Sequence, residues 1–219
     1  EIYNFLEIKK ILKKKKYKFK TKSDTEVILA AYDCWGKKCF NLFNGMWSLI
    51  IYDLKKNNLI GCRDRYGVKP LYYRRIDDSV YFASEVKQLL VLEKENIVNK
   101  KSLSGYLHHD LSSDEEQTFI ENIYQVKPGH YIDFDLVKFK FTKKKWYHFK
   151  KKILRTKYLK KEIADTLENS IKLRLRSDVK VGISLSGGID STIIASKIAT
   201  IKKKLTKEIY TFTSRSNDK

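Results

Sequence analysis

The sequence lacks the features that mark membrane, secreted or metal-binding proteins. Its 219 residues contain no apolar run long enough to cross a bilayer, and the charged start, EIYNFLEIKK, lacks the apolar region of a signal peptide. The three cysteines, Cys34, Cys39 and Cys62, do not have the spacing of a disulfide framework or a zinc site, and the four histidines show no metal-binding spacing. We therefore expect reduced, partly buried thiols in a cytoplasmic protein that does not span a membrane.

Acidic residues are in the minority. Lys and Arg number 46 against 26 Asp and Glu, a formal charge of +20 that is typical of nucleic-acid-binding proteins. However, the lysines form short scattered runs, such as Lys13 to Lys16 and Lys143 to Lys145, without the interleaved aromatic residues of a single-strand binding platform. We interpret the charge as lysine enrichment of solvated surfaces and expect no nucleic-acid partner.

The first part of the sequence mixes helical and strand-like periodicity. Apolar residues between Leu6 and Leu12 recur at helical spacing, which predicts a short amphipathic helix. Ser23 to Glu26 has the form of a capping box and predicts a helix that ends at Gly36. Strand patterns follow at 46–52, 59–63, 71–75, 80–84, 131–134 and 137–141, with a helix from about residue 85 and a helical or irregular stretch through residue 109. Hairpins mixed with a few helices predict an antiparallel α+β domain over residues 1–145.

The pattern changes in the remainder of the chain. Residues 146–157 are poor in pattern and rich in lysine, which is typical of a linker. Residues 158–219 then show a helix with apolar positions from Ile163 to Leu175, an apolar strand at 179–185, a helix at 189–201 and a strand at 209–213. This order predicts the first βαβ unit of a parallel-sheet domain. Because one such unit cannot bury both faces of its sheet, we expect the natural protein to continue beyond it.

The most specific motif is the hexapeptide Ser186-Gly187-Gly188-Ile189-Asp190-Ser191, between the last-but-one strand and the helix that follows. Paired glycines allow the backbone N–H groups to approach an anion, and the start of a helix adds its positive dipole end. The loop has neither the lysine of a Walker A motif nor the dinucleotide fingerprint. A plain turn with good helix caps is the alternative, but the whole hexapeptide at this junction resembles the PP-loop ATP pyrophosphatases, whose signature is Ser-Gly-Gly-x-Asp-Ser.

Longer stretches resemble the glutamine-hydrolysing asparagine synthetases. The matching segments are Ser23 to Gly36, Phe43 to Asp53, Arg63 to Leu90 and Leu175 to Ser191, in the family's order. The resemblance implies a class II glutamine amidotransferase domain with the N-terminal-nucleophile fold at 1–145, its N-terminal part missing, and the start of a PP-loop synthetase domain at 158–219. It also implies that glutamine, aspartate and ATP are the substrates and that Mg²⁺ accompanies the ATP. The expected products are asparagine, AMP and pyrophosphate, formed through a β-aspartyl-adenylate. The expected oligomer, if any, is a homodimer.

The resemblance also assigns residues. Glu1 would be the last member of a glutamine-binding Asn-Gly-Glu motif, and Asp24 would pair with the glutamine α-ammonium group, although without the resemblance Asp24 would be interpreted as stabilising its helix start. The family's nucleophile is a cysteine at the N-terminus, so we expect no catalytic residue in this chain and no glutamine hydrolysis by it. The expected ATP-binding residues are Leu185, Ser186, Gly187, Gly188, Asp190, Ser191 and Ser214, and Asp190 could also hold the Mg²⁺.

Some residues of the family pattern have no assigned chemistry or depart from it. We expect these residues to form ion pairs and hydrogen bonds that fix the core of the first domain and the domain interface; they are Arg63, Asp64, Arg65, Lys69, Ser84, Glu85 and Lys87. Ser214 stands where the family has an apolar residue beside adenine, and Arg215 stands where a glycine is usual. Lys180 stands where the family tends to have proline. Three alternatives remain open: an RNA-modifying PP-loop enzyme, a related amidotransferase that acts on another acid, and a non-catalytic remnant.

Overall fold

A computed structural model describes residues 1–109, 116–148, 160–202 and 209–214 of the chain. The chain divides into two compact units, residues 1–150 and residues 151–219, which are described separately below. Each unit has its own hydrophobic core, because the buried side chains cluster within one unit or the other.

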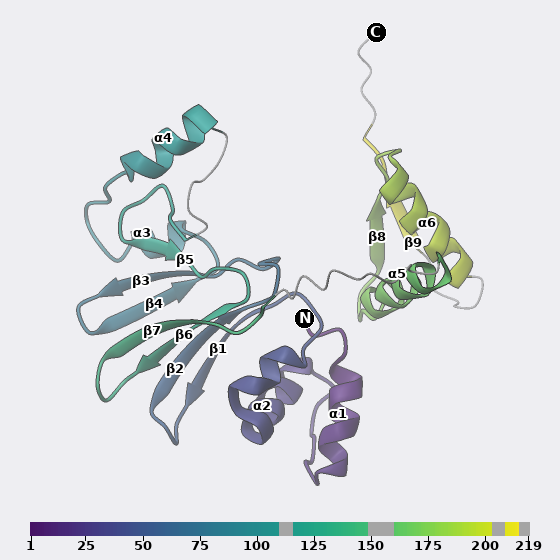
Figure 1. The fold of residues 1–219 in the computed structure, drawn as a ribbon, viewed down its shortest axis with the longest axis horizontal. Helices are drawn as coiled ribbons and strands as arrows, with labels where there is room; N and C mark the ends of the chain where they lie inside the picture. The colour runs from purple at the N-terminus through teal and green to yellow at the C-terminus, as the bar shows by residue number, and fades with distance from the viewer. Residues whose placement is uncertain (110–115, 149–159, 203–208, 215–219) are drawn as a thin grey trace. The chain divides into compact units, whose positions relative to one another are not determined.

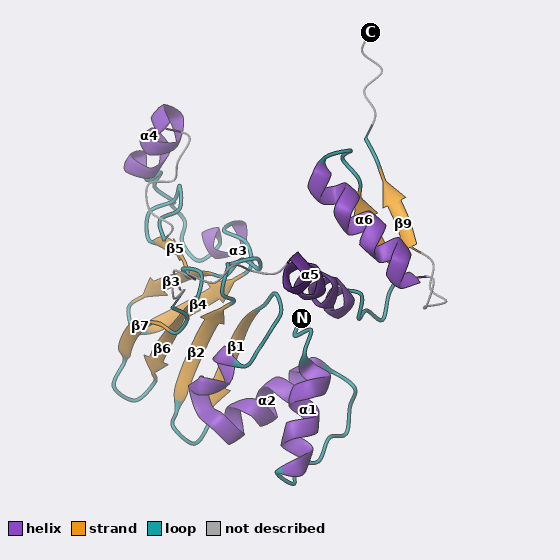
Figure 2. Ribbon diagram, turned by 45° about the vertical axis from the view of Figure 1, so that its right-hand side comes forward, coloured by secondary structure: helices purple, strands orange, loops and turns teal. Residues whose placement is uncertain are grey.

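The first unit contains two antiparallel sheets and a layer of helices (Figures 1 and 2). One sheet has the strand order β1-β2-β6-β7 and the other the order β4-β3-β5. The strands are β1 (Ser48–Asp53), β2 (Asn58–Arg63), β3 (Tyr72–Ile76), β4 (Ser79–Ala83), β5 (Ile123–Gln125), β6 (His130–Asp135) and β7 (Lys140–Lys145). The helices are α1 (Phe5–Lys14), α2 (Asp24–Trp35), the 3-10 helix η1 (Gly36–Asn41), α3 (Lys87–Leu90) and α4 (Lys100–His109). This arrangement confirms the expected α+β class with antiparallel sheets.

The alternation of side chains along β2 and β6 explains the layers. Ile60 and Cys62 of β2 are fully buried in the cluster that also contains residues of α1, α2 and η1. On the other face of the same sheet, Ile132 of β6 is buried in a cluster with Tyr73 of the second sheet and with Leu71, which directly precedes β3. Because successive strand residues point to opposite faces, one sheet packs against helices on one side and against the other sheet on the opposite side.

The start of α2 differs from the expected capping box. The Ser23 hydroxyl oxygen accepts a hydrogen bond from the Thr25 N–H at 3.1 Å, as a helix cap should. Glu26, however, does not reach back to Ser23; its carboxylate accepts from the N–H groups of Lys20 at 2.7 Å and Thr21 at 2.8 Å. These hydrogen bonds lower the pKa of Glu26 to about 2. The Glu26 carboxylate therefore holds residues 20 and 21, which precede the cap, and does not complete a capping box with Ser23.

The linker prediction was wrong at its start. Trp146 is 8% exposed, and its ring stacks on that of Trp47 with the centroids 5.5 Å apart. Its indole N–H donates to the Arg63 carbonyl at 3.2 Å. Trp146 therefore belongs to the core of the first unit, which a run of lysines immediately before it concealed in the sequence. Residues 149–157 of the expected linker lie outside the described residues.

Two further elements were missed or left undecided by periodicity. The three-residue strand β5 pairs with β3, with Tyr73 opposite Tyr124, but it is too short to show a period of its own. The stretch through residue 109 is the helix α4 over its last ten residues. The helix expected from residue 85 is only the single turn α3, with the Gln88 side chain accepting from the N–H groups of Ser84 and Glu85.

The second unit contains α5 (Lys160–Arg174), β8 (Val181–Ser184), α6 (Ile189–Lys202) and β9 (Ile209–Phe212). Strands β8 and β9 pair in parallel, with Val181 opposite Ile209 and Ser184 opposite Phe212. Ile171 of α5 and Ile198 and Ile201 of α6 form a small core against which Ile183 packs. Several large apolar side chains of this unit remain exposed, among them Val179 (75%) and Phe212 (65%).

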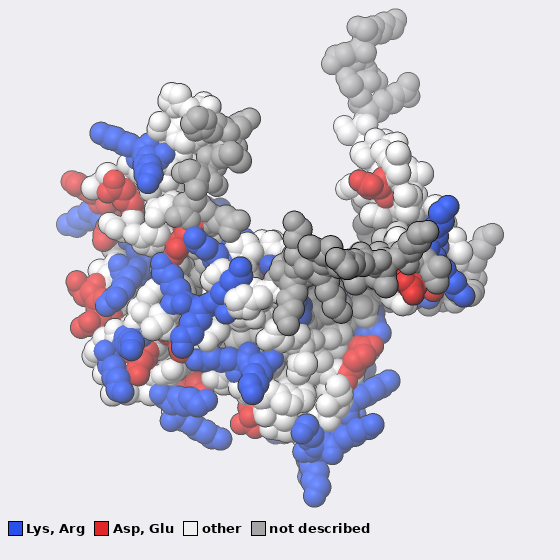
Figure 3. All heavy atoms as spheres, in the orientation of Figure 1, with Lys and Arg blue, Asp and Glu red and all other residues white. Residues whose placement is uncertain are grey.

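In the described part of the chain, no helix is both long and apolar enough to cross a membrane. On the face shown in Figure 3, Lys and Arg side chains occur over many elements, with Asp and Glu side chains among them. This distribution is consistent with solvated lysines rather than one basic stripe, while the absence of a nucleic-acid partner stays a prediction.

We predict that Trp146→Ala lowers the free energy of unfolding of the first unit by about 3–5 kcal/mol, because the substitution leaves a large cavity against Trp47. Urea unfolding followed by tryptophan fluorescence and circular dichroism would measure the change. Leu54→Ala is the matched control, since Leu54 is 78% exposed in the β1–β2 turn and should change stability by less than about 0.5 kcal/mol. Equal effects of the two substitutions would show that Trp146 is not a core residue.

Candidate functional site

The first residues of the chain pair with the segment that precedes β1. The Tyr3 N–H donates to the Asn44 carbonyl at 2.8 Å, and the Met46 N–H donates to the Glu1 carbonyl at 3.1 Å. The Glu1 backbone nitrogen in turn donates to the Met46 carbonyl at 2.7 Å. These bonds hold Glu1 in a short antiparallel bridge, with its side chain exposed.

Asp24 lies beside this bridge. It is the first residue of α2, where the positive end of the helix dipole favours a carboxylate. Its Oδ2 atom accepts a hydrogen bond from the Ile2 N–H at 2.8 Å. The structure therefore brings the two residues predicted to bind glutamine, Glu1 and Asp24, to neighbouring positions joined through Ile2.

Gly45 is required where the two segments meet. A Cβ atom at this position would lie 2.1 Å from the Glu1 carbonyl oxygen and 3.0 Å from the Ile2 Cα atom. Both are backbone atoms and cannot move aside without displacing the segment. A side chain at residue 45 would therefore push Glu1 away from its place.

The side chains at the end of β2 form a network that the sequence only partly indicated. Asp64 is 1% exposed, and its carboxylate accepts hydrogen bonds from the Trp47 N–H and from N–H groups of the loop at residues 66–69. Arg63 donates to the carbonyls of Lys69 at 2.7 Å, Val126 at 2.8 Å and Gly67 at 2.7 Å. Arg65 donates to the Asn41 carbonyl at 2.7 Å and to the Phe43 carbonyl. The expected hydrogen bonds are present, and the acceptors and donors they use are mainly backbone groups.

The cysteines do not resemble nucleophiles. Cys39 and Cys62 are fully buried in the first core, and Cys34 is half-buried at its edge. Burial raises the pKa of Cys39 to about 12 and raises the pKa of Cys62 well above its ordinary value. A neutral buried thiol is a poor nucleophile, because the reactive species is the thiolate.

In the second unit, the predicted phosphate loop joins β8 to α6. Gly187 has a φ of +82°, which favours glycine, and a Cβ atom there would meet nothing within 4 Å. The Gly188 carbonyl accepts from the Thr192 N–H at 3.1 Å and the Thr192 hydroxyl at 2.8 Å, which starts the helix. The hydroxyl oxygens of Ser186 and Ser191 lie 3.1 Å apart. The first N–H groups of α6 have no acceptor within the helix, so the open space beside the loop suits an anion.

The other predicted ATP-binding residues lie close to this loop. The Leu185 N–H donates to the Phe212 carbonyl at 2.8 Å, and the Thr213 hydroxyl donates to the Leu185 carbonyl at 3.0 Å. These bonds place Ser214 at the carboxyl edge of the two parallel strands, next to the loop. Asp190 is exposed in the first turn of α6. No three His, Cys, Asp or Glu side chains in the described residues form a metal cluster, so a Mg²⁺ held by Asp190 would need phosphate oxygens or water as further ligands.

Lys180 has a clear contact. Its Nζ atom donates to the Tyr210 hydroxyl at 2.9 Å and lies 5.1 Å from the centre of the same ring. A lysine in place of the family's proline therefore links the start of β8 to β9. Arg215, the other departure, lies outside the described residues.

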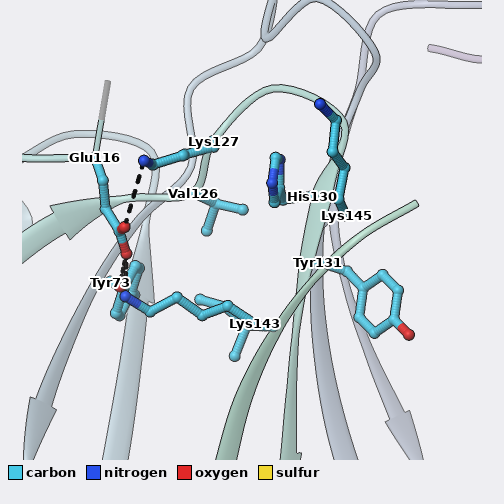
Figure 4. Close-up of a pocket in the computed structure, with 9 residues that line it drawn as sticks. Tyr73, Glu116, Val126, Lys127, His130, Tyr131, Lys143 and Lys145 are labelled. Atoms are coloured by element: carbon cyan, nitrogen blue, oxygen red, sulfur yellow. Dashed lines mark hydrogen bonds and ion pairs between the residues drawn. The ribbon is translucent and has the colours of Figure 1, made fainter. Parts of the chain in front are cut away.

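A cavity of about 260 Å³ opens between the two sheets of the first unit (Figure 4). The Glu116 carboxylate there accepts from the Tyr73 hydroxyl at 2.6 Å and from Lys143, and lies 3.9 Å from Lys127 Nζ. Burial alone would raise the pKa of Glu116, but the hydrogen bonds from Lys143 and Tyr73 outweigh it and lower the pKa. Inward-pointing lysines on an edge strand such as β7 also discourage pairing with another chain. None of the predicted site residues lines this cavity. The lining residues are Tyr73, Glu116, Val126, Lys127, His130, Tyr131, Ile132, Lys143 and Lys145.

Comparison with known families covers both units. Residues 1–147 match the family described as the glutamine amidotransferase domain. The chain belongs to this family. Residues 162–219 match a second family, described as asparagine synthase. The amidotransferase match contains Glu1 and Asp24, and the asparagine synthase match contains the whole Ser186–Ser191 loop.

Individual relatives agree with this assignment. The chain is 38% identical to asparagine synthetase [glutamine-hydrolyzing] 1 of Bacillus subtilis over 90% of this chain and 31% of that protein. It is 33% identical to asparagine synthetase [glutamine-hydrolyzing] 2 of the same organism over 97% of this chain and 29% of that protein. The chain thus spans about a third of the length of these relatives. Among solved structures, glutamine phosphoribosylpyrophosphate amidotransferase from B. subtilis matches 97% of this chain and 43% of that chain, with 15% identity and a TM-score of 0.44.

In this amidotransferase domain, sequence reasoning missed Gly45, and for Asp64 it predicted hydrogen bonds but not their partners. Both occur in the stretches quoted for the family resemblance, but their partners lie 44 and 17 residues away in the chain. Their roles could be recognised only after the pairing of Glu1–Tyr3 with residues 44–46 was known.

We predict that Gly45→Ala displaces Glu1–Tyr3 of the amidotransferase domain. Amide hydrogen exchange should show loss of protection at Tyr3 and Met46, whose N–H groups bond across this bridge. Gly36→Ala is the control: Gly36 has a φ of +55° and open space around it, so alanine there strains the backbone without touching Glu1. Retained protection at Tyr3 in the Gly45→Ala variant would contradict the steric argument.

We also predict that Cys39 and Cys62 resist alkylation by iodoacetamide at pH 8 in the folded chain, while Cys34 reacts first. All three should react at similar rates in denaturant. Fast labelling of Cys39 in the native state would show that it is more accessible than its burial indicates.

Burial also makes stability depend on pH. Since the pKa of the Cys39 thiol rises from 9.0 to about 12 in the folded chain, this thiol ionises at lower pH in the unfolded chain, so the folded state should lose stability as the pH rises through this range.

Proposed function

We propose that this chain is part of a glutamine-hydrolysing asparagine synthetase. The observation that carries the proposal is the order of the two family matches, an amidotransferase domain followed by an asparagine synthase segment, each on its own compact unit. In this proposal residues 1–145 form the type 2 amidotransferase domain, and the packing of Trp146 extends this domain by one residue. Residues 158–219 form the start of the PP-loop domain. The proposal includes a cytoplasmic location.

In the first unit the proposed ligand is glutamine. The Asp24 carboxylate would pair with the α-ammonium group, and its place beside the Ile2 N–H keeps it next to Glu1. The nucleophile would be a cysteine at the N-terminus of the whole protein, whose own amino group would act as the base. The described thiols do not substitute for it. Cys39 and Cys62 are buried and neutral, and Cys34 lies at the end of α2, where its nitrogen is a backbone amide and not a free amino group. The 219-residue chain by itself should therefore release no glutamate from glutamine.

In the second unit the proposed ligand is ATP. The N–H groups at the start of α6, with the hydroxyls of Ser186 and Ser191, would hold the phosphates, and Leu185 and Ser214 would lie beside the adenosine. Asp190 would hold a Mg²⁺, which neutralises phosphate charge when bound. Adenylation of aspartate would release pyrophosphate, and ammonia would then displace AMP, because a carboxylate accepts ammonia only when it carries a good leaving group.

A related amidotransferase that acts on another acid is the nearest alternative. The described residues that the proposal uses bind glutamine and ATP, and none of them selects the acceptor. Replacing aspartate by other carboxylic acids in the product assay would separate the two. An RNA-modifying enzyme is the other alternative, and it should bind tRNA and retard its migration in an electrophoretic assay at physiological salt. We do not expect such binding, because the lysines are scattered over the surface.

We predict that the whole protein converts ATP to AMP and pyrophosphate in the presence of aspartate and ammonia. Asp190→Ala should abolish this activity and leave glutamine hydrolysis within about twofold of wild type, because the two reactions use different units. Asp178→Ala is the matched control, an exposed carboxylate of the same unit outside the loop. Chromatographic analysis that found ADP instead of AMP would overturn the PP-loop assignment. Equal loss of both activities in Asp190→Ala would indicate a folding defect.

A further inference from the structure

The ladder between β1 and β2 ends in an unusual way. Its last regular pair is Ser48 with Arg63. At the next position the Asp64 N–H donates to the Trp47 carbonyl at 2.9 Å, as a continuing ladder would. The Trp47 N–H, however, donates to the Asp64 side-chain atom Oδ2 at 3.2 Å. The Asp64 carbonyl instead accepts from Gly129 at 2.8 Å and Gly67 at 3.3 Å, so the carboxylate replaces a backbone acceptor where the strands diverge.

The same carboxylate holds the loop that follows. Its Oδ1 atom accepts from the N–H groups of Tyr66 at 3.0 Å and Val68 at 3.1 Å, and its Oδ2 atom also accepts from Lys69 at 3.0 Å. Asp64 is 1% exposed, so these donors are its substitute for water. Four backbone donors on one buried carboxylate make a rigid junction, because charge-assisted hydrogen bonds are stronger than neutral ones.

The junction determines where residues 44–46 go. Residues 44–46 lie just before Trp47 and β1. They pair with Glu1–Tyr3 through the hydrogen bonds from the Tyr3 N–H to Asn44 and from the Met46 N–H to Glu1. Ile2, the central residue of this bridge, is fully buried and donates its N–H to Asp24. Hydrogen bonds and the short stretches of backbone between them therefore connect the Asp64 carboxylate, through Trp47 and residues 44–46, to Glu1 and Asp24.

We propose that Asp64 is a positioning residue for the glutamine site: its carboxylate fixes Trp47, and thereby sets the place of Glu1 and Asp24. This inference rests on the proposed function for the identity of the ligand. Asp64 does not touch glutamine in it; the residue acts through the backbone of residues 44–47. The path itself is a property of the first unit and holds for any ligand of Glu1 and Asp24.

The decisive substitution is Asp64→Asn, which keeps the shape of the side chain. An amide NH₂ group cannot accept a hydrogen bond, so one pair of donors, Tyr66 and Val68 or Trp47 and Lys69, loses its acceptor. Either loss breaks the four-donor junction, and we expect it to loosen Trp47. Asp133→Asn is the matched control. Asp133 lies on β6 in the same unit, where its carboxylate accepts from Asn58 and pairs with Lys37, away from residues 44–47.

The kinetic test uses the whole protein and compares synthesis from glutamine with synthesis from ammonia. Asp64→Asn should raise the KM for glutamine about tenfold or more and leave the ammonia-dependent rate within about twofold, since ammonia bypasses the site. Asp133→Asn should change neither value. A glutamine KM within about twofold of wild type in Asp64→Asn would overturn the proposal. If Asp64→Asn does not fold, Asp64→Glu keeps the charge but displaces the acceptor, and it should raise the same KM; a folded Asp64→Glu variant with the wild-type KM would overturn the proposal too.

Amide hydrogen exchange on the 219-residue chain separates this inference from the proposed function. Asp64→Asn should remove protection at Tyr3 and Met46 as well as at Trp47, whereas Asp133→Asn should not. Unchanged protection at Tyr3 and Met46 in Asp64→Asn would overturn the positioning role. A wild-type protein that used ammonia but no glutamine would refute the proposed ligand, while the exchange result would still decide whether Asp64 positions Glu1.

Discussion

Backbone groups at the end of β2 are satisfied by charged side chains, and the layout of the first unit depends on this. Where the strands of a sheet diverge, their N–H and carbonyl groups lose their ladder partners and need others. Arg63 supplies donors for three carbonyls, and Asp64 supplies an acceptor for four N–H groups. Both side chains bond to backbone groups of residues 66–69, and together they hold this loop in place as it leaves the sheet.

The same region joins the two ends of the first unit. Trp47 follows the bridge to Glu1–Tyr3, and Trp146 follows β7, yet their rings stack, and the Trp146 indole bonds to the Arg63 carbonyl. Arg65 lies 5.5 Å from the Trp146 ring centre. The core that surrounds the candidate glutamine site is therefore built from chain segments about a hundred residues apart, which makes the site sensitive to packing far from Asp24.

The second unit illustrates a different relation between structure and site. Its loop needs only one strand, one helix and a glycine with positive φ, all within a few residues of each other. The parallel partner β9 then fixes Leu185 through Phe212 and Thr213. Because most of the groups proposed to bind phosphate lie close together in the sequence, this candidate site could be predicted from the sequence more completely than the one in the first unit.

Local periodicity was sufficient for most helices and strands and for the Ser186–Ser191 loop, since these depend on neighbouring residues. The resemblance of longer segments indicated both domains and named Glu1 and Asp24. Sequence could not show that Trp146 is buried, that β5 joins β3, or that Glu26 binds Lys20 and Thr21 rather than Ser23.

Tertiary structure alone decided the roles of Gly45 and Asp64. Gly45 matters because the Glu1 carbonyl lies against it, and Asp64 matters because the Trp47 N–H needs an acceptor just before β1 begins. Neither requirement leaves a periodic trace, because it arises when distant backbone segments meet and must satisfy each other's hydrogen bonds without water.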